Sequence, residues 1–285
     1  MSRVITAQTR FHSEEISPGV RLERFHPGGR FGPNDEVRLA TEGGQGWSEI
    51  VLLGGPSDPF TMMLPDIRLP ANQFWPLHWH DCWTVVLVVE GTCLVGDWWM
   101  APGDVFITMP ELEYGPLVSG PEGVRLFEIF AQAHLAPGGY APEYRDHPTL
   151  QGGQHVFRER SPLNRRNEGR QTLPLDGVEG VWKTRMTPGA AWDLGEAGDP
   201  DRGLMKDTRL EAGERILAHS YGDWHGLFVL DGAIRIGERV LGEDAYLLIE
   251  PNGAVDEIVA EPGGAQLLEL SRTARGAERK LAAGA

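Results

Sequence analysis

The chain has 285 residues, and its 26 basic and 41 acidic side chains give a net charge of −15. A charge of this sign repels phosphate backbones and anionic lipid surfaces, so we expect neither nucleic acid nor a membrane as partner. The two cysteines, Cys82 and Cys93, are too few for a disulfide framework, and residues 1–15 lack the apolar core of a signal peptide. We therefore expect a cytoplasmic protein.

Short apolar runs bounded by turn residues dominate the chain. Its 37 glycines and 21 prolines interrupt the sequence at intervals typical of short strands. The clearest runs, in chain order, are 84–89, 105–108, 227–230 and 245–249. Runs of this length and spacing predict an all-β protein, built as a barrel or a sandwich.

Two segments lack this strand pattern. Residues 134–173 are rich in Pro, Gly and Arg, and we expect them to connect two domains. Residues 272–285 are rich in Ala, Arg and Lys and have no apolar face, which predicts a tail that is frayed or disordered.

The sequence repeats itself at an offset of 141 residues. This offset aligns His78 with His219, Trp83 with Trp224, Gly91 with Gly232, Pro110 with Pro251 and Glu128 with Glu269. A constant offset held over some sixty residues indicates two copies of one domain. We predict an N-terminal domain with an extended arm at 1–150, and a linker, a second domain and a short tail at 151–285.

Two motifs in the N-terminal copy resemble those of the cupin family. Residues 77–84 read LHWHDCWT and lead into a strand that ends at Gly91, and residues 101–110 read APGDVFITMP. Both motifs recur in the second copy. The resemblance implies a bicupin, that is, two tandem antiparallel β-barrels of the double-stranded β-helix or jelly-roll type. Cupins include dioxygenases, isomerases, decarboxylases, lyases, sugar-binding regulators and seed storage proteins, so the resemblance leaves the reaction open.

The first motif contains a candidate metal site. Alternation along a strand places His78 and His80 on one face, where two imidazoles can bind iron, nickel, copper, zinc or manganese. The family pattern expects a glutamate at Thr84 and a further histidine at Tyr114 or Gly115. Tyr114 is our candidate for a third ligand or a hydrogen-bonding acid. A loop glutamate, at 111 or 113, is the alternative.

The second copy departs from the family pattern in other ways. His219 keeps the first histidine position, Tyr221 replaces the second, and His225 stands where the glutamate belongs. The loop after Pro251 places Asp256 at the last histidine position. His219, His225 and Asp256 would form the two-histidine, one-carboxylate set that suits non-haem iron, and a solvated acidic turn at Asp256 is the alternative.

These observations favour a metal-dependent enzyme that acts on a small oxygen-bearing organic substrate. A ferrous-iron dioxygenase is the preferred reaction, and Mn²⁺, Ni²⁺, Zn²⁺ or Cu²⁺ are the other metals considered. An isomerase, hydrolase or decarboxylase is an alternative, as is a non-catalytic ligand-binding bicupin with degenerate metal sites. A bicupin resembles a fused dimer of single cupins, so we expect a monomer or a homodimer.

Overall fold

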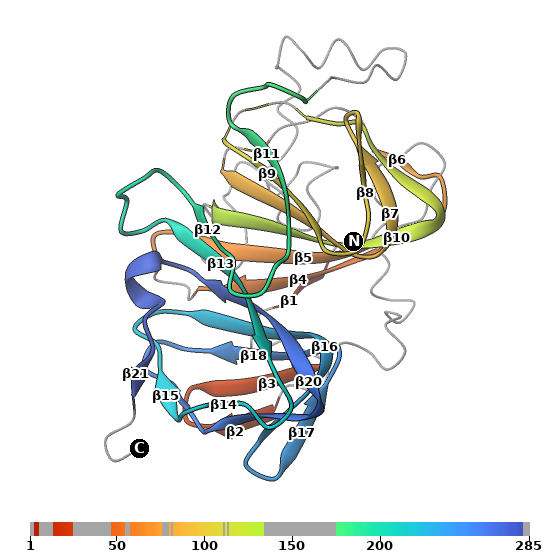
Figure 1. Ribbon diagram of the computed structural model, residues 1–285. Helices are drawn as coiled ribbons and strands as arrows, with labels where there is room; N and C mark the ends of the chain where they lie inside the picture. The colour runs from red at the N-terminus through yellow and green to blue at the C-terminus, as the bar shows by residue number, and fades with distance from the viewer. Residues whose placement is uncertain are drawn as a thin grey trace. The chain divides into compact units, whose positions relative to one another are not determined.

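The structure is a computed structural model in which residues 3–5, 14–24, 47–54, 58–75, 80, 82–110, 112, 114–133 and 175–281 are described (Figure 1). Nearly all regular structure in these ranges is β-strand, and the central strands pair antiparallel. The predicted all-β fold is confirmed. No helix in the described ranges is long and apolar enough to cross a membrane.

One nine-stranded sheet comes mainly from the first half of the chain. Its strands are β1 (Arg3–Ile5), β4 (Trp47–Leu53), β5 (Thr61–Leu69), β6 (Phe74–Trp75), β7 (Trp83–Val95), β8 (Trp98–Met100), β9 (Asp104–Thr108), β10 (Leu117–Ala133) and β11 (Val181–Arg185). The order across the sheet is β1-β4-β5-β10-β7-β9-β11, with β6 paired to β10 and β8 paired to β7. The long pair of β7 and β10 forms its centre.

A second nine-stranded sheet comes mainly from the second half. Its strands are β2 (Glu14–Ser17), β3 (Val20–Arg24), β12 (Ala191–Leu194), β13 (Gly203–Leu210), β14 (Arg215–Ile216), β16 (His225–Ile236), β17 (Arg239–Gly242), β18 (Ala245–Ile249) and β20 (Ile258–Ser271). The order is β12-β13-β20-β16-β18-β3-β2, with β14 paired to β20 and β17 paired to β16. A small sheet holds β19 (Ala254–Val255), β15 (His219–Ser220) and β21 (Lys280–Leu281) in that order, and a 3₁₀ helix, η3, spans Ala274–Gly276.

The repeat predicted from the sequence is present in the strands. The offset of 141 residues superposes the bounds of β9 on those of β18 and the bounds of β6 on those of β14. Gly91 and Gly232 have φ values of 70° and 71°, and a Cβ on either would lie 2.2 Å from the carbonyl oxygen of Gly123 or Gly264. Both copies therefore need glycine at this turn, because a side chain would collide with the backbone of the neighbouring strand.

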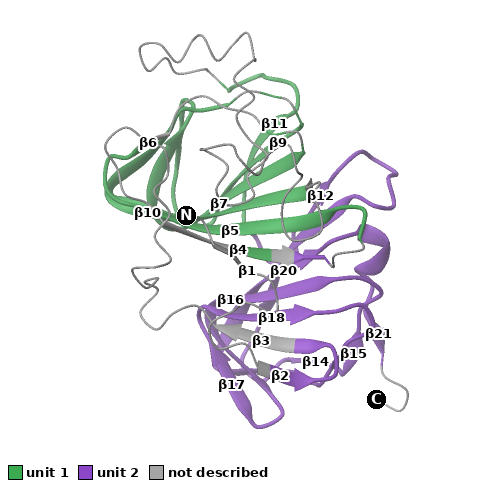
Figure 2. Ribbon diagram, turned by 180° about the vertical axis from the view of Figure 1, so that it is seen from behind, with its two compact units in different colours: residues 1–4, 31–52, 56–186 green, residues 5–30, 53–55, 187–285 purple. Residues whose placement is uncertain are grey.

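Each compact unit includes a strand from outside its own copy of the repeat. β3 pairs with β18, where Arg24 lies opposite Ala245, and β11 pairs with β9, where Arg185 lies opposite Asp104. The N-terminal unit consists of 1–4, 31–52 and 56–186, and the C-terminal unit of 5–30, 53–55 and 187–285 (Figure 2). The predicted domains 1–150 and 151–285 are continuous segments, whereas these units interleave along the chain.

Each unit has an apolar core of its own. The core of the N-terminal unit includes Val86, Val88, Phe106, Leu126 and Tyr114. The core of the C-terminal unit includes Leu227, Ile234, Leu247, Leu267 and Tyr221. Both tyrosines are fully buried. A buried hydroxyl needs a hydrogen-bond partner, so polar groups must lie inside each core.

The prediction of a frayed tail was wrong for residues 272–281. Arg272 is buried and donates from Nε and Nη2 to Oδ1 of Asp223, at 2.9 and 2.6 Å, and the Thr273 hydroxyl donates to Oδ2 at 2.6 Å. β21 then pairs with β15. The tail is fixed by charged and hydroxyl side chains, which leave no apolar periodicity in the sequence.

Candidate functional site

A histidine, a tyrosine and a glutamate meet inside the N-terminal unit. The ring nitrogen Nε2 of His80 lies 2.8 Å from the hydroxyl of Tyr114, which donates to Oε1 of Glu128 at 3.0 Å. Nε2 of His80 is also 3.4 Å from that oxygen of Glu128. The exposed fractions of the three residues are 2%, 0% and 3%, so the cluster is shielded from water.

Three separate elements bring these side chains together. His80 precedes β7, Tyr114 follows β9, and Glu128 lies in β10, opposite Val86 of β7. The ring of Phe106 packs against Tyr114 with 4.8 Å between centroids, and the ring of Phe130 packs against His80 at 4.6 Å. The cluster thus has an aromatic wall.

The hydrogen bonds define where the protons lie. A phenol has one proton, and Tyr114 donates it to Glu128, so the bond between His80 and Tyr114 requires the imidazole N–H to donate to the phenol oxygen. Burial, followed by the charge of Glu128, raises the pKa of Tyr114 well above its ordinary value. Tyr114 is therefore a neutral phenol, suited to hold or donate a proton.

The structure describes only some of the other residues predicted for this site. His78, Glu111 and Glu113 lie outside the described residues, so the paired orientation of His78 and His80 stays a prediction. The Thr84 hydroxyl, at the family's glutamate position, donates to the carbonyl of Cys82 at 3.1 Å. The nearby carboxylate comes instead from Glu128, which the family pattern does not indicate.

A second histidine–tyrosine–glutamate set lies in the C-terminal unit. The ring of His225 stacks on Tyr221 with 3.6 Å between centroids and 6° between planes. Its Nδ1 lies 2.7 Å from the Ser271 hydroxyl, and its Nε2 lies 3.4 Å from Oε2 of Glu269. His225 and Ser271 are opposite one another across β16 and β20, which fixes this contact. Glu269 is the repeat equivalent of Glu128.

Glu269 is surrounded by positive and hydroxyl groups. Arg279 donates from Nη2 to Oε1 at 2.6 Å and from Nε to the Tyr221 hydroxyl at 3.2 Å, and Nζ of Lys206 lies 3.7 Å from Oε1. The Thr208 hydroxyl also donates to Oε1. Burial alone would raise the pKa of Glu269, but His225, Arg279 and Thr208 together lower it, so the carboxylate is ionised.

His219 and His225 are both neutral. Burial is the largest influence on both and lowers the pKa of His219 and of His225 below the ordinary value. Nδ1 of His219 lies 2.8 Å from the carbonyl of Leu217 and so carries the proton, which leaves Nε2 buried and without a hydrogen-bond partner. Nε2 of His225 is likewise buried with no hydrogen bond formed.

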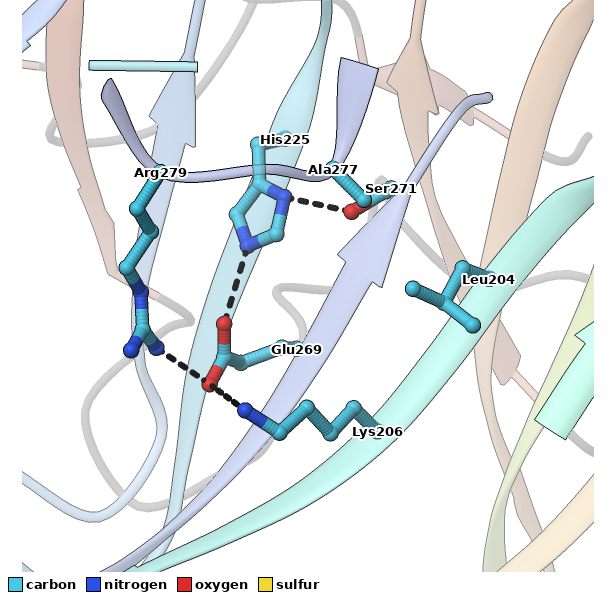
Figure 3. Close-up of a pocket in the computed structure, with 7 residues that line it drawn as sticks. All are labelled: Leu204, Lys206, His225, Glu269, Ser271, Ala277 and Arg279. Atoms are coloured by element: carbon cyan, nitrogen blue, oxygen red, sulfur yellow. Dashed lines mark hydrogen bonds and ion pairs between the residues drawn. The ribbon is translucent and has the colours of Figure 1, made fainter. Parts of the chain in front are cut away.

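A cavity of about 290 Å³ opens beside this cluster (Figure 3). It is lined by Leu204, Lys206, His225, Glu269, Ser271, Ala277 and Arg279. In the close-up, the Lys206 and Arg279 side chains approach the Glu269 carboxylate, and the ring of His225 lies between Ser271 and Glu269. The lining combines two cations, one carboxylate and an apolar wall.

The structure does not bring Asp256 to His219 and His225. Strand alternation buries Val255 and leaves Asp256 exposed, where it lines a different cavity of about 470 Å³ with Ile236 and Arg239. The predicted facial set is therefore corrected: the carboxylate beside His225 is Glu269.

Several solved structures resemble this chain in architecture. Pirin YhhW from Escherichia coli, solved in complex with nickel(II), matches with a TM-score of 0.52 and 13% identity over 88% of this chain and 98% of that chain. Oxalate decarboxylase OxdC from Bacillus subtilis matches with a TM-score of 0.50 and 13% identity, over 85% and 76%. The chain has the bicupin fold.

A third solved structure is that of a protein from Nostoc punctiforme to which a dioxygenase activity has been assigned without proof. It gives a TM-score of 0.56 and 11% identity, over 90% of this chain and 81% of that chain. No protein-family model and no curated protein matches the sequence. At identities of 11–13%, these structural matches show a shared fold alone. One fold can serve several chemistries, so the matches do not determine the reaction of this bicupin.

The two units of the bicupin differ in how well they suit a metal ion. Within the described ranges, no three His, Cys, Asp or Glu side chains form a group that could hold one. The N-terminal unit offers His80 and Glu128, with a phenol oxygen beside them, and the imidazole and carboxylate donors suit a divalent transition metal. In the C-terminal unit, Arg279 and Lys206 already neutralise Glu269 and would repel a cation. The N-terminal unit thus supplies two donor groups of the kind that bind a metal, whereas the C-terminal unit places cations beside its carboxylate.

Sequence reasoning missed Glu128, Glu269 and Arg279. A signal for the two glutamates exists, because the repeat places Glu at the same position of two strands, directly after two large apolar residues in each. A charged residue repeated on a buried strand indicates a paired interior group. Arg279 has no such signal, because it belongs to a tail with no equivalent in the first copy.

Proposed function

We propose that this bicupin is a metal-dependent enzyme whose active centre lies in the N-terminal unit and acts on a small oxygen-bearing organic substrate. The observation that carries the proposal is the convergence of His80 and Glu128, two buried ligand-type groups, on one phenol. His78 would supply a further imidazole by strand alternation. A divalent ion would be held by these three side chains.

We favour a dioxygenase, with Fe²⁺ as the metal. When bound, such an ion supplies Lewis-acid and dioxygen-activating chemistry. The role of Tyr114 is to hold a proton beside the substrate, because burial keeps its phenol neutral. Phe106 and Phe130 limit the access of water and give the site an aromatic face for an organic substrate. With Mn²⁺, Ni²⁺, Zn²⁺ or Cu²⁺, isomerisation, hydrolysis or decarboxylation would replace oxygenation.

Metal content tests the proposed ligands. Protein purified without chelators should contain close to one transition-metal ion per chain by elemental analysis. His80→Ala should lower metal affinity by more than about tenfold, since it removes a ligand outright. Glu128→Gln keeps the size of the side chain and should also weaken metal binding. It tests the proposed ligands even where His80→Ala folds poorly. His219→Ala is the matched control and should keep its metal. Equal loss in His219→Ala, or no metal in the native protein, would contradict the proposal.

Tyr114 separates proton handling from metal binding. Tyr114→Phe keeps the ring and removes only the hydroxyl, so metal content should stay near that of the native protein. Turnover, followed as oxygen uptake in a screen of ketones, diketones and aromatic acids, should fall by about 10²-fold, the usual scale for a general acid. Unchanged turnover in Tyr114→Phe would remove the catalytic role of this residue.

A non-catalytic ligand-binding bicupin is the second candidate. The ion pairs that fill the C-terminal unit favour it for that half of the molecule. Metal-free native protein that binds organic ligands but turns none over would support it for the whole chain. A cytoplasmic location and a monomeric or homodimeric state remain part of our proposal.

A further inference from the structure

We propose that the cavity of the C-terminal unit binds a small carboxylate, without a metal, through Lys206 and Arg279. This binding site is separate from the proposed metal centre and does not depend on it. The cavity is lined by residues of β13, β16, β20 and the tail, all within one unit (Figure 3).

The charge of the lining favours an anion. Two cations surround one carboxylate, and His225 in the lining is neutral, so the site carries a net positive charge in a chain whose overall charge is −15. Nζ of Lys206 lies 3.7 Å from Glu269, too far for a hydrogen bond, and its donors can turn to a ligand. Arg279 uses Nε and Nη2 on Tyr221 and Glu269, and no described residue accepts from its Nη1.

A buried nitrogen with only a long polar contact points to the same cavity. Nε2 of His225 forms no hydrogen bond and its contact with Oε2 of Glu269 is 3.4 Å long, whereas Ser271 holds Nδ1 at 2.7 Å. A buried polar nitrogen left unsatisfied costs about 1–3 kcal/mol, and a ligand oxygen would remove that cost. A Ser271 hydroxyl that donates to Nδ1 leaves the proton on Nε2, which then presents an N–H donor.

The apolar part of the lining selects among anions. Leu204 and Ala277 form a wall beside the two cations, so a ligand with a short carbon chain can bury that chain while its carboxylate meets Lys206 and Arg279. A volume of about 290 Å³ is large enough for a carboxylate with a short carbon chain. Inorganic phosphate has no apolar part and would leave the wall uncovered.

Calorimetric titration of the full chain with propionate, malonate and phosphate, at constant ionic strength, tests the site. Propionate or malonate should bind in the millimolar range or better and more tightly than phosphate. Lys206→Met should weaken binding by about tenfold or more, the scale of one lost charge-assisted hydrogen bond. Lys280→Met is the matched control, because Lys280 is exposed in the same tail and does not line the cavity. It should leave the affinity unchanged.

Two further measurements make the outcome decisive. Arg279→Lys keeps a charge and should retain more affinity than Arg279→Met, whose folding is checked by its thermal unfolding. Binding should persist after chelator treatment and in His80→Ala, which separates this site from the proposed metal centre. The proposal is overturned if no carboxylate binds, if phosphate binds as tightly as propionate, or if Lys206→Met and Lys280→Met weaken binding equally.

Discussion

The two units surround the same repeated glutamate with different residues. Glu128 meets His80 and Tyr114, whereas Glu269 meets His225 and Tyr221. The offset of 141 places Tyr221 at the position of His80 and His225 at the position of Thr84, so both positions around the repeated carboxylate carry a different residue type in the second copy. Arg279 and Lys206 then decide the charge of the second set. A few substitutions in one fold thus separate the cation site and the anion site that we propose.

The buried imidazoles of the C-terminal unit predict how stability depends on pH. Burial lowers the pKa of His225 below its ordinary value of 6.5, so the unfolded chain binds more protons than the folded chain just below that pH. The stabilisation is complete above pH 6.5 and is lost as the pH falls through the lower, folded-state value. The free energy of unfolding should therefore fall between pH 7 and 5, by up to about 1.4 kcal/mol per pH unit for each extra proton.

His225→Gln tests this dependence. Glutamine does not titrate, so denaturant unfolding of the variant should show a shallower loss of stability between pH 7 and 5 than the native protein. The two curves should run parallel above pH 7, where the imidazole is neutral in both the folded and the unfolded chain. Parallel curves over the whole range would contradict a neutral, buried His225.

The sequence allowed part of the candidate site to be predicted at this scale. His80 and Tyr114 were predicted from the motif, and the structure places them in contact. Glu128 was not predicted as a site residue, because the family pattern puts the carboxylate at position 84, on the same strand as the histidines. The carboxylate here reaches the site from a strand some fifty residues away in the chain. Such a contact depends on strand pairing and register, which local patterns do not encode.

The strands were better predicted than the tail. Apolar runs ending at glycine or proline mark β7, β9, β16 and β18, because a buried strand needs a continuous apolar face and a turn at its end. Residues 272–281 carry no such pattern. They are fixed instead by contacts of Arg272 with Asp223 and of Arg279 with Glu269, charged groups 49 and 10 residues apart in the sequence. Such pairs leave no periodicity to detect.

The contact between Arg272 and Asp223 should stabilise the protein by holding the tail that follows it. Both side chains are 9% exposed, and removing one partner of a buried ion pair costs about 3–5 kcal/mol. Arg272→Ala should lower the free energy of unfolding by about this amount and raise the rate of amide hydrogen exchange in residues 274–281.

Arg275→Ala is the control, because Arg275 is 63% exposed in its ion pair with Asp201. Its cost should stay below about 1 kcal/mol. Similar effects in the two variants would contradict the proposed role of Arg272.

At the scale of the whole molecule, the repeat and the all-β class followed from the sequence, whereas the interleaving of the units did not. A repeat identifies equivalent strands, but it does not say which sheet an additional edge strand joins. β3 precedes the first copy of the repeat and pairs with β18 of the second copy, and β11 precedes the second copy and pairs with β9 of the first. An edge strand left unpaired exposes backbone hydrogen-bonding groups. Each half of the chain therefore completes the sheet of the other.

This interleaving predicts that the halves do not fold well apart. A fragment of residues 1–150 lacks β11 and leaves one edge of β9 unpaired. A fragment of residues 151–285 lacks β2 and β3 and leaves one edge of β18 unpaired. Each fragment alone should lose cooperative thermal unfolding or aggregate. The two fragments expressed together should associate and recover a cooperative transition, because every strand is then present. A full chain carrying a protease site at position 150, cleaved after folding, is the control and should keep its circular dichroism spectrum. Independent, cooperative folding of both fragments would show that β3 and β11 are dispensable for the two sheets.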